Sequence, residues 1–87
     1  MTEHERTNTE LIKEFNRYVR DHPEFAEKIP DDATVIMQLE GDEAFNAWAR
    51  ELAEVRQAEG ERVVFVRIRK LAPIHSRIEA LEVEPVV

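Results

Sequence analysis

Basic side chains are concentrated in one short segment of an otherwise acidic chain. Residues 62–77 contain five Arg or Lys residues and no Asp or Glu, whereas residues 1–60 contain 15 acidic and 7 basic residues. Alternate residues of a strand project from the same face, so Arg67 and Arg69 on a strand would lie side by side and could bind one ligand together. Paired guanidinium groups bind anionic ligands and acidic protein surfaces. The candidate contact residues for an anion or a protein partner are Arg67, Arg69, Lys70, His75 and Arg77.

The same cations also have a structural explanation, which we favour. The acidic excess in residues 1–60 offers many carboxylates, so these side chains are expected to form ion pairs within the protein. RNA is a further ligand for a basic strand, but the net charge of −7 disfavours non-specific binding to nucleic acid. We therefore expect no nucleic-acid partner.

Three other places hold groups that act as ligands or catalysts in many proteins. Glu40, Asp42 and Glu43 follow a predicted strand, where a divalent cation would find oxygen ligands. A solvated turn that caps the next helix explains them more simply. His22 is a candidate proton carrier, but its place before a proline favours a cap or core edge. Ser76 has no nucleophile elbow around it, so we predict no catalytic, cofactor-binding or metal-binding residue and no cofactor.

Composition removes several classes of function. The 87 residues include no cysteine, which excludes disulfides, thiolate nucleophiles and zinc–cysteine sites. No apolar run approaches the length of a membrane span, and the N-terminus lacks the apolar segment of a signal peptide. We expect a cytoplasmic protein without a membrane partner. Charged residues reach 36%, against about 25% in average domains, which also fits a heat-adapted organism.

The first half of the chain predicts two helices and a strand. Residues 1–7 are expected to be a disordered tail, and a capping box formed by Thr7 and Glu10 starts a helix. Pro23 ends this helix and begins a short second one over 23–29. Residues 34–39 then read as a buried strand.

The second half predicts a strand–helix–strand unit. Asp42 caps a helix that stops near Gly60, and residues 63–71 form the next strand. Residues 78–83 suggest a third strand, but Ile78 and Leu81 disagree in parity, which leaves a bulge or a short helix as alternatives. The fold class is α/β, or α+β if the strands are not adjacent. We expect one domain over 8–87, with a βαβ unit and a two- to three-stranded sheet covered by helices.

Three segments resemble one small protein family. They are residues 22–30 (HPEFAEKIP), residues 42–46 (DEAFN), and the pair of Leu71-Ala72-Pro73 with Ser76-Arg77-Ile78. Together they are similar to a family of uncharacterised prokaryotic proteins that is known only as a domain of unknown function. The resemblance spans roughly residues 8–80. It implies an intact single domain and brings no activity or ligand with it.

Three functional hypotheses follow from these observations. The leading one is a non-enzymatic interaction module that self-associates as a homodimer or binds another protein, because no convergent catalytic set is present. The second is an acidic antidote-type protein that masks a basic partner by electrostatic attraction. The third is a small enzyme or anion binder that uses the basic segment 62–77.

Overall fold

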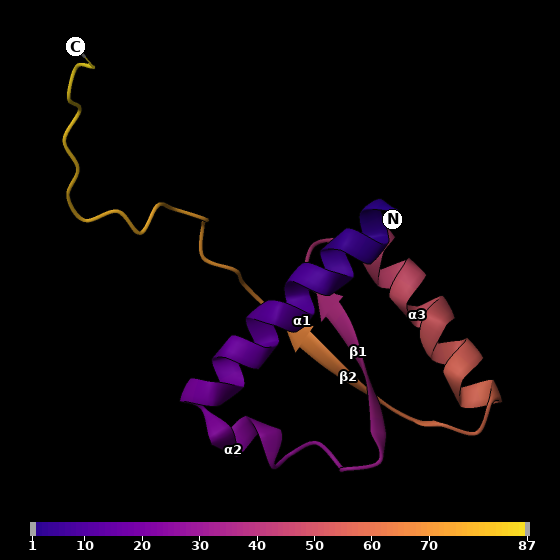
Figure 1. Ribbon diagram of the computed structural model, residues 1–87. Helices are drawn as coiled ribbons and strands as arrows, with labels where there is room; N and C mark the ends of the chain where they lie inside the picture. Colours follow the sequence, from indigo (N-terminus) through magenta and orange to yellow (C-terminus); the bar gives the residue numbers. More distant parts are fainter. Residues whose placement is uncertain (1, 87) are drawn as a thin grey trace.

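The fold is a strand–helix–strand unit preceded by two helices. The computed structural model describes residues 2–86, and its elements are α1 (Glu3–Asp21), α2 (Pro23–Ala26), β1 (Ala33–Leu39), α3 (Glu43–Ala58) and β2 (Arg62–Ile68). β1 and β2 form a two-stranded parallel sheet, with Ala33 beside Arg62 and Leu39 beside Ile68. The predicted order α-α-β-α-β and the parallel βαβ unit are confirmed (Figure 1).

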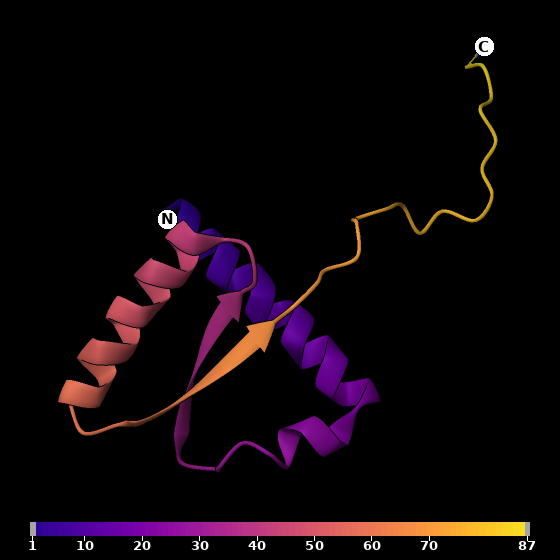
Figure 2. The ribbon, with the colours of Figure 1, turned by 180° about the vertical axis from the view of Figure 1, so that it is seen from behind.

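The two faces of this sheet are covered by different helices. Ile36 and Met37 are neighbours in β1 and point to opposite faces, yet they are only 4% and 1% exposed. α1 crosses in front of the strands in Figure 1 and behind them in Figure 2, whereas α3 packs on the other face. Leu11 of α1 and Phe45 of α3 complete the core around β1.

α1 begins earlier than the sequence predicted. The Thr2 hydroxyl accepts a hydrogen bond from the Glu5 N–H (3.2 Å), and the Glu5 carboxylate accepts one from the Thr2 N–H (3.3 Å). This capping box replaces the predicted box of Thr7 and Glu10. The prediction of a disordered tail over residues 1–7 is therefore wrong from Glu3 onward.

Aromatic packing explains the earlier start. The His4 ring lies 6.2 Å from the Phe45 ring and 5.9 Å from the Trp48 ring, measured between centroids. The first turn of α1 is thereby held against α3, a tertiary contact that local sequence signals do not contain. Met1 of the predicted tail and Val87 of the predicted domain lie outside the described residues.

The C-terminal part of the chain also differs from the prediction. Residues 69–86 form neither helix nor strand, and they extend away from the helices and the sheet (Figures 1 and 2). The predicted third strand over 78–83 is therefore absent from the described chain, because this segment has no neighbouring strand to pair with. The radius of gyration is 17.6 Å, against about 12 Å for a compact chain of this length.

The outer edge of β1 is closed at both ends by local hydrogen bonds. The Leu39 N–H donates to Asn46 Oδ1 and the Asn46 Nδ2 donates to the Leu39 carbonyl, both at 2.8 Å. The Asn46 amide thus takes the place of a peptide group on a third strand. At the other end, the Ala33 N–H donates to the Pro30 carbonyl (3.0 Å).

Local signals also determine where the crossover helix begins and ends. Asp42 Oδ1 accepts a hydrogen bond from the Phe45 N–H (3.1 Å), which confirms the predicted cap of α3. The chain leaves α3 through Gly60, whose φ of +88° strongly favours glycine. The Thr34 hydroxyl then donates to Glu61 at 2.6 Å, which joins the end of the crossover to β1.

Replacing the β1 cap tests the first of these contacts. We expect Asn46→Ala to lower the free energy of unfolding by about 1–2 kcal/mol, because both polar groups of Leu39 lose their partner. Asn16→Ala, at an exposed position of α1, is the matched control and should change stability by less than about 0.5 kcal/mol. Urea denaturation measures both, and equal effects would contradict the proposed role of Asn46.

The Thr34 hydrogen bond predicts a pH effect. It holds the pKa of the Glu61 carboxyl below its usual range, opposed by desolvation and assisted by Arg56. A folded-state pKa below the unfolded one stabilises the protein above the unfolded pKa, and this stabilisation is lost as the pH falls through the folded value. We expect Thr34→Val to raise the pKa of Glu61 in an NMR titration and to lower stability at neutral pH, with the difference from the unmodified protein disappearing as the pH falls below the folded-state pKa. An unchanged titration curve would show that the hydroxyl is not the cause.

Candidate functional site

A groove runs between the helices and the outer edge of β2. It has a volume of about 530 Å³ and is lined by residues of α1, α2, β2 and the first residues of the tail. Its floor is apolar and includes Phe15, Val66 and Ile68. Pockets of this size and character commonly hold a ligand or part of a partner chain.

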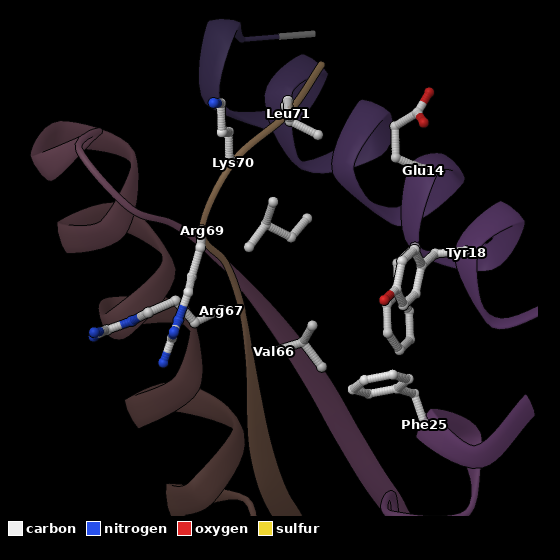
Figure 3. Close-up of a pocket in the computed structure, with 10 residues that line it drawn as sticks. Glu14, Tyr18, Phe25, Val66, Arg67, Arg69, Lys70 and Leu71 are labelled. Atoms are coloured by element: carbon white, nitrogen blue, oxygen red, sulfur yellow. The ribbon is translucent and has the colours of Figure 1, made fainter. Parts of the chain in front are cut away.

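One side of the groove is an aromatic wall, formed by Tyr18 and Phe25 and supported by His22, which stacks on Tyr18 without lining the groove. The Tyr18 and His22 rings stack at a centroid distance of 4.1 Å, and the Phe25 ring meets Tyr18 edge-on at 5.4 Å. The ammonium group of Lys28 lies 4.7 Å from the centroid of the Phe25 ring. Figure 3 shows Phe25 directed across the groove toward Val66.

The aromatic wall is held by the break between α1 and α2. The His22 N–H donates to the Tyr18 carbonyl (2.9 Å), and the His22 Nδ1 lies 3.1 Å from the same oxygen. Pro23 then starts α2 at its first position, which sets Phe25 beside Tyr18. His22 therefore closes one helix and opens the next, as predicted for a structural histidine.

The opposite rim of the groove is basic. Arg67, Arg69 and Lys70 line it, and in Figure 3 both arginine side chains point away from the aromatic wall. Glu14 is the acidic residue among the lining residues, and its carboxylate pairs with Arg17 at 2.8 Å. The rim therefore carries a positive charge that the groove itself does not neutralise.

The expected internal pairing of the basic segment is found at one residue. Arg62 Nη1 lies 3.8 Å from Asp32 Oδ1. Within residues 2–86, the other four cations of the segment form no ion pair, so the favoured explanation is wrong for Arg67, Arg69, Lys70 and Arg77. α3 covers β1 more closely than β2, and Glu14 of α1, which shares the groove with three of these cations, pairs with Arg17 instead.

The structure brings only part of the predicted contact set together. Arg67, Arg69 and Lys70 share the groove, whereas His75 and Arg77 lie on the extended tail and do not line it. His75 Nδ1 lies 3.2 Å from the Pro73 carbonyl, and the Ser76 hydroxyl accepts from the Ile78 N–H (3.1 Å). Each of these contacts joins residues that are two positions apart, so neither holds the tail against the rest of the protein.

The acidic turn before α3 has a structural role. Asp42 caps the helix, and Glu40 donates its N–H to the Ile68 carbonyl at 2.9 Å, continuing the ladder of the sheet. Within residues 2–86, no three side chains of the metal-ligating types come together as a metal site. No helix in the same part of the chain is long and apolar enough to cross a membrane.

The outer edge of β2 supplies a second element of the site. Because Glu40 donates to Ile68, the even-numbered peptide groups of β2 face β1 and those of Val63, Phe65 and Arg67 face outward. Among residues 2–86 these outward groups have no backbone partner, in contrast to the ends of β1. Phe65 is 48% exposed along this edge.

The aromatic wall was not recognised from sequence as part of a site. Tyr18 and Phe25 lie at apolar helical positions, and that spacing predicts core residues. They are instead 47% and 37% exposed, because the sheet ends at β2 and offers no further strand to cover them. The tyrosine hydroxyl and the adjacent His22–Pro23 break were the available signals of a surface position.

A comparison with known protein families covers all the helices and strands and most of the tail. Residues 3–81 match the family described as "Family of unknown function (DUF5647)". The chain belongs to this family. The resemblance inferred from the sequence is thus confirmed at the level of a family without an established function. The matched region extends through most of the tail, so the family pattern includes residues beyond β2. No curated protein and no solved structure matches the chain.

Two phenylalanines distinguish the groove from the core. We expect Phe45→Ala, at a residue with no exposed surface, to cost about 3–5 kcal/mol of unfolding free energy. Phe25→Ala should cost clearly less, because the Phe25 side chain is 37% exposed and its contacts with Tyr18, His22 and Lys28 lie at the surface. Thermal and urea unfolding of both variants measure the difference. Comparable losses of unfolding free energy in the two variants would show that Phe25 is a core residue and would contradict its assignment to the groove.

Proposed function

We propose that the protein is a small, non-enzymatic interaction module that self-associates through the free edge of β2. The observation that carries this proposal is the contrast between the two sheet edges. Asn46 and Pro30 close the two ends of β1 and leave the outward groups between them, at Val35 and Met37, without a backbone partner, whereas all the outward peptide groups of β2 lack one within residues 2–86. An unpaired strand edge is a template for a strand from another chain.

The surroundings of β2 support a protein ligand. The groove beside the strand combines an apolar floor, an aromatic wall and a basic rim. Aromatic and arginine side chains are the residue types enriched at protein interfaces. As part of the same proposal we place the module in the cytoplasm, since a chain without cysteine has no disulfide to gain from an oxidising compartment.

The proposal is tested by the mass of the protein in solution. We expect light scattering coupled to size exclusion to give a dimer that dissociates on dilution. Phe65→Lys should shift the equilibrium to the monomer, because a lysine on an edge strand opposes strand addition. Val55→Lys is the matched control: Val55 is 54% exposed but lies on α3, so the dimer should persist.

A monomer for the full chain at high concentration would overturn the proposal. Equal effects of the two lysine variants would show that association does not involve the β2 edge. Circular dichroism of both variants confirms that the fold is retained, since each replaced side chain is half exposed.

A further inference from the structure

The tail carries apolar side chains that nothing in its own chain covers. Leu81 is 66% exposed, Val83 is 90% exposed, and no element packs on either of them within residues 2–86. They alternate with Glu82 and Glu84, so an extended segment here has one apolar face and one acidic face. The family pattern reaches into this segment, as far as Leu81.

We propose that residues 79–84 of one copy add to β2 of a second copy as a parallel strand, and that the two copies exchange tails reciprocally. This inference rests on the proposed self-association and names the segment that fills the groove. Each copy then supplies an edge and a strand, so the contact is closed by two-fold symmetry.

The apolar face of the tail fits the helical side of the groove. In the parallel register, Leu81 lies beside Val66 and Val83 beside Ile68, on the face of β2 that is turned toward the aromatic wall. Side chains of neighbouring residues in a sheet share one face and pack together. The added strand would thereby cover Tyr18 and Phe25, which the two-stranded sheet leaves exposed.

The acidic face of the tail fits the basic rim. In the same register Glu82 lies beside Arg67 and Glu84 beside Arg69, on the opposite face of the sheet. These arginines have no carboxylate partner among residues 2–86. The tail thus supplies the counter-charge that the rest of the chain does not.

The start of the added strand is also matched. Ala80 lies beside Phe65, where a small side chain leaves room for the ring. Glu79 lies beside Val64 on the helical side, and Val64 and Lys28 both line a second, smaller hollow that shares Phe15, Phe25 and Val66 with the groove. An antiparallel strand that placed the same glutamates on the same arginines would carry Leu81 beyond the end of β2 at Ile68.

The connection to β2 requires that the tail comes from a second copy. A parallel strand in the same chain needs a crossover of roughly a dozen or more residues, and only residues 69–78 separate β2 from this segment. The linker contains no Gly, Asn or Asp for a tight turn, and Pro73 keeps Ala72 extended. Fully extended, it spans about 33 Å, comparable with the shorter dimensions of the molecule, 31 and 23 Å.

A charge exchange between two full-length variants tests the proposal. The first variant is Glu82→Arg with Glu84→Arg, and the second is Arg67→Glu with Arg69→Glu. Each variant alone places like charges at both contacts, so its dimer should dissociate at least about tenfold more readily. In a mixture, both contacts pair opposite charges, and native mass spectrometry should show the heterodimer in large excess over either homodimer.

The possible outcomes distinguish the proposed tail exchange from self-association through the edge of β2 alone. Homodimers of both variants, with a statistical heterodimer in the mixture, would overturn the tail exchange. Loss of the dimer in Phe65→Lys but not in the tail variant would do the same and leave self-association through β2 intact. A monomeric full chain would overturn both proposals.

A second pair of variants tests the apolar contact. Leu81→Asp should raise the dimer dissociation constant by at least about tenfold, because a buried carboxylate would face the aromatic wall. Ile74→Asp, at a fully exposed position of the linker, should leave it unchanged. Both positions are exposed in the monomer, so neither substitution disturbs its fold, and equal dissociation constants for the two variants would contradict the proposed register.

Discussion

The constraint on which this structure depends is that a sheet of two strands has two edges and very few residues with which to protect them. Each backbone N–H and C=O at an edge needs a partner or water. On β1 the side-chain amide of Asn46 and the carbonyl of Pro30 supply partners from the same chain. β2 receives no such protection, and the groove, the basic rim and the exposed aromatic wall all lie along this strand.

The architecture follows from signals that are short in range. Pro23 separates the first two helices, Asp42 starts the crossover helix, and Gly60 ends it; each acts through its own backbone or its nearest neighbours. A helix of 16 residues between two apolar strands connects them as a right-handed parallel crossover in nearly all known cases. The βαβ unit could therefore be predicted from the sequence.

The incorrect predictions concern features that depend on contacts between residues far apart in the sequence. α1 starts at Glu3 because His4 meets two aromatic rings of α3, and no local pattern reveals that contact. Tyr18 has the spacing of a core residue but lies at the surface, since burial depends on how many strands the sheet contains. The pairing of Arg67 was mispredicted for a related reason. The overall charge shows that carboxylates are plentiful, but it does not show which of them lie within reach of this strand or which are already paired, as Glu14 is with Arg17.

The amide of Asn46 also bears on how large an assembly can become. Chains that offer one strand and one free edge form closed rings if the exchange is reciprocal, and fibres if it is not. In the proposed dimer each β2 edge is used once, and each sheet then ends on one side at the partner's tail strand and on the other at β1, whose ends are already occupied. One asparagine side chain therefore opposes strand addition at the far side of the sheet, while the reciprocal exchange, which uses both tails and both β2 edges, favours a particle of two copies over continued growth.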